Sequence, residues 1–291
     1  MEVHLVDGTY ELFRHFFALP AHANAAGLEV AAARGVLGSM VSLLEEGATH
    51  IGVATDRVIE SFRNGLYPGY KTGEGIDPEL FAQFGPLERG LEAAGFALFG
   101  MVEHEADDGL AAAAARAEAD PRVKRVWICT PDKDLAQCVR GERVVLLDRR
   151  KRVHYDAAGV REKFGVAPAS IPDYLALVGD SADGFPGLPG WGAKSSATVL
   201  AHYEHLEAIP ASADDWAVKP RGAAKLAATL AERGEEARLY RRLATLVVEG
   251  PEVGEVDDWR WSGARDDFRD VAAELDAANL LPRLERLAAS R

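Results

Sequence analysis

The stretch "GDSADGFPGLPGWGAKSSATVL" (Gly179–Leu200) is a rigid, acidic loop that runs directly into a helical pattern. Five glycines and two prolines occur in its first fourteen residues. Glycine lets backbone amides approach a ligand closely, and the start of the following helix directs further N–H donors outward. Such a surface suits a nucleic-acid phosphate that is bound without sequence preference. We therefore predict that the segment "GLPGWGAKS" (residues 187–195), which lies between two helical patterns, binds a nucleic-acid backbone, with Lys194 as an added cation.

Other loop types fit this stretch less well. A Walker phosphate loop follows a strand and has its lysine directly after the last glycine, but here Ala193 precedes Lys194 and no strand comes before. A calcium EF-hand needs a glutamate at its twelfth position, which is Trp191 when counted from Asp180. A plain corner between two helices would explain the glycines, but not the lysine together with Asp180 and Asp183.

Upstream of this loop, short apolar runs alternate with helical patterns. The predicted strands are Val3–Gly8, Thr49–Asp56, Phe96–Gly100, Val123–Asp132 and Arg143–Asp148. Helical spacing extends over Ala31–Gly47 and Ala106–Asp120, and a glycine-rich irregular excursion covers residues 64–81. This alternation indicates an α/β fold with a mostly parallel sheet flanked by helices. Strand signals nearly stop after residue 163, so we predict an α/β domain over 1–165 and a helical region over 166–291.

Acidic residues recur where the predicted strands end. They are Asp7 and Asp56, then Glu105, Asp107 and Asp108, then Asp132 and Asp134. The carboxyl ends of parallel strands meet at one edge of a sheet, where open α/β proteins build their sites. Each acid alone could be a helix N-cap or part of a solvated turn. Together, unpaired carboxylates at one edge would repel one another strongly unless cations bind there.

The type of ligand indicates the metal. Carboxylate oxygens without a nearby histidine or cysteine set favour Mg²⁺ or Mn²⁺ over zinc. Asp180 and Asp183 extend the acidic set. Two such ions about 3.5–4 Å apart are the usual means of phosphodiester hydrolysis. The sequence therefore predicts a Mg²⁺ or Mn²⁺ centre, with two ions, that cleaves a nucleic acid.

Composition sets limits on these predictions. The chain is 48% hydrophobic and 27% charged, as in ordinary soluble globular proteins. It has no apolar run near the roughly 20 residues that span a bilayer, no signal peptide and only two cysteines, so we expect a cytoplasmic protein. The net charge of −13 alone argues against a nucleic-acid partner. Arg63 and Lys71 could polarise a phosphate, although their spacing equally allows two surface cations.

Taken together, the motifs resemble the 5′ nucleases, the family of the N-terminal 5′→3′ exonuclease domain of bacterial DNA polymerase I, phage 5′ exonucleases and flap endonucleases. The similarity runs in order through "LVDGTYELFRHFFALP", "ATDRVIESFRNGLYPGYK", "EHEADDGLA", "TPDKDLAQ" and the opening loop, and continues weakly through "EEARLYRRLATLVVEGPEV". It thus covers nearly the whole chain. The resemblance implies a PIN-like, resolvase-like nuclease core and a helix–three-turn–helix module that binds duplex DNA with the help of K⁺.

The resemblance also implies roles for individual positions. The implied metal ligands are Asp7, Asp56, Glu105, Asp107, Asp108, Asp132, Asp134, Asp180 and Asp183, with Asp56 and Asp108 the least expected to bind directly. Lys71 and Arg63 match positions near the scissile phosphate. A 5′ end or flap would pass an arch at about residues 64–92. The resemblance also implies a helix–hairpin–helix over residues 179–203 that binds DNA through Gly190, Gly192, Lys194 and Ser195.

Three positions depart from the family pattern. A second basic residue three positions after Lys71 is replaced by Glu74, which removes a cation from the arch. The usual asparagine after the second hairpin aspartate is Gly184, and the usual glutamate before the hairpin lysine is Ala193. The first of these departures favours weaker catalysis or weaker 5′-end recognition.

We therefore expect a stand-alone, monomeric, Mg²⁺-dependent structure-specific 5′–3′ exonuclease or flap endonuclease. Its expected partner is DNA with 5′ ends or flaps, and we expect no membrane and no small-molecule cofactor. Two alternatives stay open. One is a DNA-binding homologue with weak or no cleavage, and the other is a ribonuclease of the wider PIN-like class.

Overall fold

The computed structural model describes residues 1–290, which form two compact units. The first unit comprises Met1–Ser61, Gly73–Thr130 and the C-terminal segment that begins at Val247. The second unit comprises Phe62–Thr72 and Pro131–Leu246. Within residues 1–290, no helix combines the length and the apolarity that crossing a bilayer requires.

The first unit is built on four parallel strands in the order β3-β2-β1-β4. Their bounds are β1 Glu2–Asp7, β2 His50–Asp56, β3 Ala97–Met101 and β4 Arg125–Cys129. Val3 of β1 pairs with His50 on one side and Val126 on the other. β1 and β2 are almost entirely buried because helices cover both faces, as is usual for parallel strands. The predicted parallel α/β core is confirmed.

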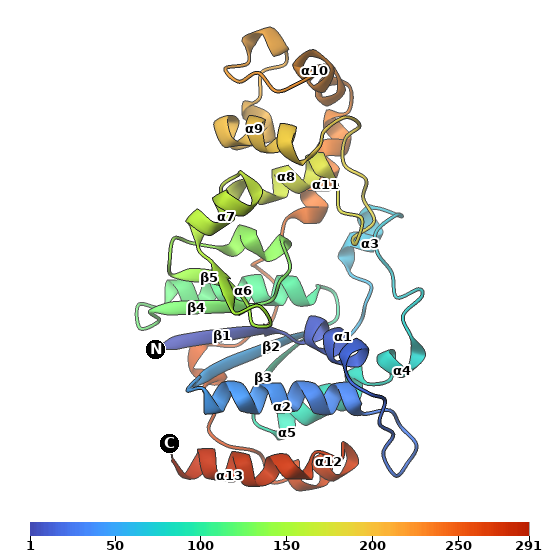
Figure 1. Cartoon of the computed structure of the whole chain (residues 1–291), viewed down its shortest axis with the longest axis vertical. Helices are drawn as coiled ribbons and strands as arrows, with labels where there is room; N and C mark the ends of the chain where they lie inside the picture. The colour runs from blue at the N-terminus through green and yellow to red at the C-terminus, as the bar shows by residue number, and fades with distance from the viewer. Residues whose placement is uncertain (291) are drawn as a thin grey trace. The chain divides into compact units, whose positions relative to one another are not determined.

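Helices cover the two faces of these strands. The first unit contains α1 Gly8–Ala18, α2 Ala31–Glu45, α4 Pro78–Phe81, α5 Phe84–Ala93, α6 Ala106–Ala119, α12 Phe268–Glu274 and α13 Leu281–Ala289. The chain moves outward from β1 to β2 to β3 and then returns to β4. Since such crossovers are right-handed, α6 lies on the opposite face from α1 and α2 (Figure 1). The strand order also reverses between β1 and β4, and this reversal is the usual place for a site in an open sheet.

The C-terminal segment returns to the first unit. Trp261 donates from its backbone to Thr49 O and from its indole to Ala94 O, both at 2.9 Å. Arg265 N donates to Ala93 O at 2.8 Å. The compact units group residues by their contacts and differ from the predicted domains, whose boundary near residue 165 stays a prediction. Periodicity in a sequence indicates that a segment is helical, but it does not indicate which part of the chain that helix packs against.

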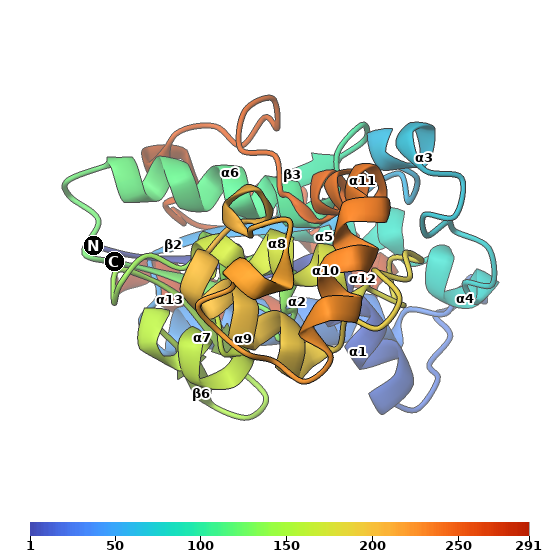
Figure 2. The same ribbon diagram turned by 90° about the horizontal axis from the view of Figure 1, so that it is seen from above.

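The second unit is mainly helical. It contains one antiparallel pair, β5 Val144–Asp148 and β6 Val153–Tyr155. Its α-helices are α3 Phe62–Leu66, α7 Ala157–Phe164, α8 Ile171–Val178, α9 Ala193–Tyr203, α10 Ala223–Glu232 and α11 Gly234–Ala244. α7 lies beside β6 (Figure 2), and α8 packs against α9 and α11. The helical character predicted after residue 165 is confirmed here by α8 to α11, and β5 was predicted as a strand, whereas the three-residue β6 is too short to give a sequence signal.

Candidate metal centre and nucleic-acid interface

Two predicted metal ligands of the first unit lie where strands end and also order helix termini. Asp7 follows β1 and caps α1, because its Oδ1 accepts from Tyr10 N at 2.8 Å. Its Oδ2 accepts from the Thr130 hydroxyl at 3.0 Å. Asp56 ends β2, and its Oδ1 accepts from Ala106 N at the start of α6 at 2.8 Å. The predicted placement at the carboxyl ends of strands is therefore correct for both residues.

The acids that begin α6 are held in a similar way. Asp108 is fully buried, and its two oxygens accept from Glu105 N at 3.0 Å and Val247 N at 2.8 Å. Glu105 is buried and accepts from the Ser61 hydroxyl at 2.7 Å, while Asp107 is half-buried in the first turn. The capping role of acids at helix starts is thus present in this unit. Metal ligation by these five acids stays a prediction.

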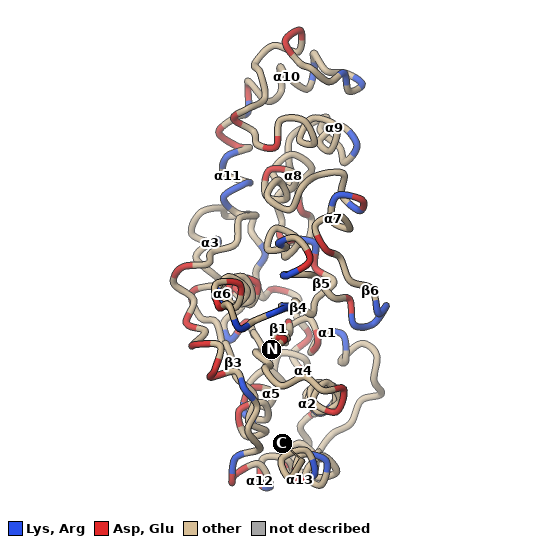
Figure 3. Tube along the Cα trace, turned by 90° about the vertical axis from the view of Figure 1, so that its left-hand side faces the viewer, with Lys and Arg blue, Asp and Glu red and all other residues tan. Residues whose placement is uncertain are grey.

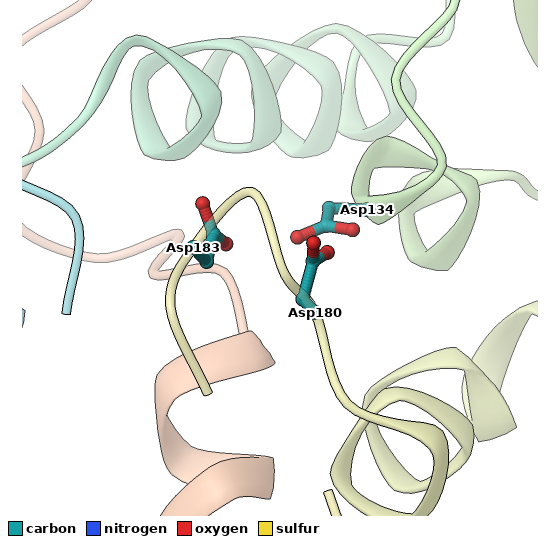
Figure 4. A group of neighbouring side chains, drawn as sticks. All are labelled: Asp134, Asp180 and Asp183. Atoms are coloured by element: carbon teal, nitrogen blue, oxygen red, sulfur yellow. The ribbon is translucent and has the colours of Figure 1, made fainter. Parts of the chain in front are cut away.

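The second unit brings three predicted ligands together. Asp134 begins a short 3₁₀ helix, and Asp180 and Asp183 lie in the loop that follows α8 (Figure 4). All three are buried, and each offers a carboxylate oxygen within 4.8 Å of the other two. In residues 1–290 no other set of three or more histidine, cysteine, aspartate or glutamate side chains meets this spacing. We call these residues the carboxylate triad.

Asp134 of the triad is buried among like charges. The residue is 5% exposed, and its Oδ1 has no hydrogen-bond partner. Burial raises the pKa of Asp134 well above its usual value, and the charges of Asp132, Asp183 and Asp180 raise it further. An unsatisfied buried polar atom costs about 1–3 kcal/mol. A bound cation would relieve this cost.

Two lysines neutralise part of the triad in this structure. The Lys133 ammonium contacts Asp180 Oδ2 and lies 3.7 Å from Asp134 Oδ1. Burial opposes its charge, but Asp134 and Asp180 outweigh burial and raise the pKa of Lys133. Lys71 Nζ lies 3.0 Å from Asp183 Oδ1. The predicted Lys71 is therefore at the triad. Lys133 was not predicted, although its position inside the "DKD" motif is a signal that could have found it.

Asp132 and Arg63 have other surroundings. Asp132 is exposed, and its Oδ1 accepts from Asp134 N at 3.0 Å, so it orders the turn that presents Asp134. Arg63 is 1% exposed and donates to Leu243 O at 2.8 Å and Thr245 O at 3.1 Å. Its guanidinium thus binds carbonyls at the end of α11. Contact of Arg63 with a phosphate stays a prediction, and it would require Arg63 to leave these carbonyls.

The predicted hairpin forms one side of an open groove of about 690 Å³. Its lining residues are Gly190, Gly192, Ala193, Lys194, Ser195, Thr198, Lys219, Pro220 and Arg221. Trp191 anchors the hairpin, because its buried indole donates to Leu226 O at 3.2 Å and packs near Trp216. This anchor brings the hairpin lysine close to two exposed cations that precede α10.

Two details of the groove differ from the simplest sequence expectation. The Ser195 hydroxyl accepts from Gly192 N at 3.0 Å, so this hairpin amide is satisfied within the loop. Lys219 and Arg221 were not predicted as part of the site. They are 25 and 27 residues from Lys194 in the sequence. The signal that could have indicated them is the pair of cations on either side of Pro220.

Charge is distributed unequally between the two units (Figure 3). The first unit has 14 Lys and Arg against 30 Asp and Glu, a net charge of −16. The second has 19 Lys and Arg against 16 Asp and Glu, a net charge of +3. The overall charge of −13 therefore does not describe the unit that contains the groove. The objection that net charge raised against a nucleic-acid partner applies to the first unit.

Comparison with known proteins agrees with this architecture. The family model "5′-3′ exonuclease, N-terminal resolvase-like domain" matches residues 2–165. The model "5′-3′ exonuclease, C-terminal SAM fold" matches residues 166–267. The chain belongs to the 5′–3′ exonuclease family. This family membership confirms the resemblance inferred from the motifs and identifies the chain as a relative of nucleases.

Individual relatives agree with the family assignment. The chain is 38% identical over 246 residues to DNA polymerase I of Pseudomonas aeruginosa, covering 83% of this chain and 27% of the relative. It is 32% identical over 286 residues to DNA polymerase I of Bacillus subtilis, covering 96% of this chain and 32% of the relative. The chain thus spans about a third or less of the length of these relatives.

Solved structures share the fold of this 5′–3′ exonuclease family member. The bacteriophage T5 D15 flap endonuclease, solved with DNA and metal ions, matches with a TM-score of 0.66 at 20% identity, over 99% of this chain and 100% of that chain. Flap endonuclease-1 from Methanococcus jannaschii matches with a TM-score of 0.60 at 15% identity, over 99% and 93%. At these identities the likeness establishes the fold.

Proposed function

We propose that the chain is a Mg²⁺- or Mn²⁺-dependent 5′ nuclease that hydrolyses phosphodiesters of DNA at 5′ ends or flaps. The observation that carries this proposal is the carboxylate triad, with its buried Asp134 oxygen that has no hydrogen-bond partner. Family membership supports the reaction class. The T5 relative that was solved with DNA and metal ions supports the substrate and the cofactor class.

The residues of the triad fit a hard divalent cation. Three carboxylates supply oxygen ligands only, which is the donor set that Mg²⁺ and Mn²⁺ prefer. When bound, one or two such ions would supply a more acidic water and would neutralise charge on the phosphate. Asp134, Asp180 and Asp183 would hold an ion. Ligation by Asp7, Asp56, Glu105, Asp107, Asp108 and Asp132 and the presence of two ions remain parts of the proposal that rest on the resemblance.

Lys71, which lies beside the triad, would act on the substrate. Lys71 Nζ is one-third exposed and lies at the edge of the triad, where it could place positive charge against a phosphate. Asp132 accepts from the backbone N of Asp134, and Asp180 Oδ1 accepts from Ala182 N at 3.0 Å, so these bonds order the Asp134 backbone and the Asp180 carboxylate.

The groove at the hairpin would hold the DNA backbone. Lys194, Lys219 and Arg221 are exposed and line one groove, so they could bind neighbouring phosphates. Contacts of these cations with phosphates would carry no sequence information, which agrees with recognition of DNA structure in place of sequence. A K⁺ ion at the hairpin and a monomeric state remain proposals from the resemblance.

The decisive experiment uses pure protein, Mg²⁺ and a duplex with a labelled 5′ flap. We expect release of the flap with a 5′-phosphate on the product, and loss of the reaction when EDTA is added. Intact DNA binding without cleavage would contradict the nuclease proposal and favour the DNA-binding homologue. Cleavage of single-stranded RNA but not of the flap would favour the ribonuclease.

A further inference from the structure

The loop that carries Asp180 and Asp183 is closed tightly on itself. Asp180 N donates to Phe185 O at 2.8 Å, and Phe185 N donates to Asp180 O at 3.0 Å. Phe185 is 1% exposed and stacks on the Tyr240 ring with centroids 5.6 Å apart. Residues 180–185 therefore form a rigid turn that is anchored on α11.

The segment that carries Lys71 is seated on this turn. Lys71 N donates to Asp183 O at 3.0 Å, and Lys71 Nζ lies 3.0 Å from Asp183 Oδ1. On its other side, Lys71 O accepts from the Asn64 side chain at 2.9 Å. Both the backbone and the ammonium of Lys71 are thus positioned relative to one residue of the triad.

Gly184 is the residue that permits this seating. Its φ of +87° lies in the left-handed region that favours glycine. A Cβ at position 184 would lie 2.1 Å from Gly69 O, which is a backbone atom that cannot move without shifting the Lys71 segment. This is also a position where the family resemblance led us to expect asparagine. Any side chain at 184 would push residues 69–71 away from the turn.

We propose that Gly184 is a positioning residue for Lys71. The missing Cβ lets residues 69–71 pack directly on the Asp180–Phe185 turn, and this packing places the Lys71 ammonium at the carboxylate triad. This inference rests on the proposed function for its effect on cleavage. The seating itself is a property of the protein without substrate and can be tested separately.

The first test is amide hydrogen exchange, with Gly222→Ala as a matched control. Gly222 has a φ of +77° in the same unit, but a Cβ at position 222 would meet no atom within 4 Å, so the control carries the backbone strain without the clash. We expect the Lys71 amide to be protected in the wild type, and Gly184→Ala to speed its exchange by about tenfold or more relative to Gly222→Ala. Equal exchange in the two variants would overturn the proposal. If Gly184→Ala does not fold, the wild type alone still tests the seating of Lys71. Fast exchange of its Lys71 amide would then overturn the proposal.

The second test is a double-mutant cycle on flap cleavage. Displacement of a substrate-contacting group by about 1 Å can cost 100-fold, so we expect Gly184→Ala to lower kcat by about 10- to 100-fold. In the Lys71→Met background, Gly184→Ala should lower kcat almost no further, because the ammonium that Gly184 positions is already absent. Losses that multiply would assign Gly184 a purely structural role. A wild type that cleaves no flap would contradict the proposed function, while the exchange result would still decide the seating.

Discussion

The two units of this protein use their acidic side chains differently. In the first unit, Asp7, Asp56 and Asp108 accept hydrogen bonds from backbone amides at helix starts. In the second, Asp134 Oδ1 has no hydrogen-bond partner, and two lysines neutralise part of the negative charge of the triad. An acidic side chain can therefore stabilise the fold by accepting backbone hydrogen bonds, or destabilise it when it is buried among like charges without such bonds. The hydrogen-bond partners distinguish these cases, whereas sequence position does not.

The largest expected effect comes from Asp134→Asn, which keeps the shape of the side chain and removes its charge. We expect flap cleavage to fall about 1,000-fold, because several kcal/mol of metal-dependent stabilisation are lost. The pKa of Asp134 is raised in the folded protein, so the unfolded chain releases this proton first, and stability falls as the pH rises from the usual aspartate range toward the raised pKa.

The same variant should therefore be more stable than the wild type at pH 7 in EDTA. A rise of a few degrees in Tm is the expected size of this change. Thermal unfolding followed by circular dichroism and a flap-cleavage assay provide the two readouts. A lower Tm would refute the destabilising effect of the Asp134 charge, and cleavage at the wild-type rate would refute its role as a metal ligand.

Asp108→Ala should have the opposite effect on stability. This change leaves the amides of Glu105 and Val247 without their acceptor in a fully buried place. Each unsatisfied buried donor costs about 1–3 kcal/mol, so we expect a loss of that order in the free energy of unfolding. Urea unfolding measures it. If Asp108→Ala is as stable as the wild type, the backbone-capping role of the first unit's acids is wrong.

Variants of Lys219 and Arg221 test whether the cations of the groove in the second unit bind DNA. The double variant Lys219→Ser, Arg221→Ser should weaken duplex binding by about tenfold at moderate salt and lower the slope of log K against log [salt] by about 2. Lys124→Ser is the control, since Lys124 is an exposed cation of the acidic first unit. Fluorescence anisotropy over a range of KCl concentrations gives both values. Equal losses in the control and the double variant would mean that the groove has no special role.

The smallest expected effect concerns the helical scaffold of the second unit. The hydrogen bonds from Arg241 lower the pKa of Glu207 to about 2. A carboxyl group whose pKa is lower in the folded than in the unfolded chain stabilises the fold at pH values above its unfolded pKa. This stabilisation is lost as the pH falls toward the folded pKa. Glu207→Gln should therefore lower Tm slightly at pH 6, and the difference should disappear between pH 4.5 and 2. A difference that is constant over this pH range would exclude the ion pair as its cause. Because Glu207 is largely exposed, solvent screening keeps the effect small.

Much of this architecture could be predicted from local patterns. The four parallel strands and α9 occur where apolar runs and helical spacing placed them, because burial on both faces of a sheet requires continuous apolar runs and a helix requires a repeat of 3.6 residues. The grouping of Asp134, Asp180 and Asp183 was also predicted, as was the nearness of Lys71. Here the local motifs and the resemblance were sufficient.

Other features depend on contacts between distant residues. The sequence could not indicate that residues 247–290 pack in the first unit, because amphipathic helices do not specify their partner. The burial of Arg63 against α11, the groove position of Lys219 and Arg221, and the contact of Lys133 with the triad arise in the same way. By itself, the sequence determined the family, most of the elements and the acids that we propose as metal ligands. Only the tertiary structure decided which charges are satisfied and which remain available for chemistry, because hydrogen bonding and desolvation depend on every group that surrounds a side chain.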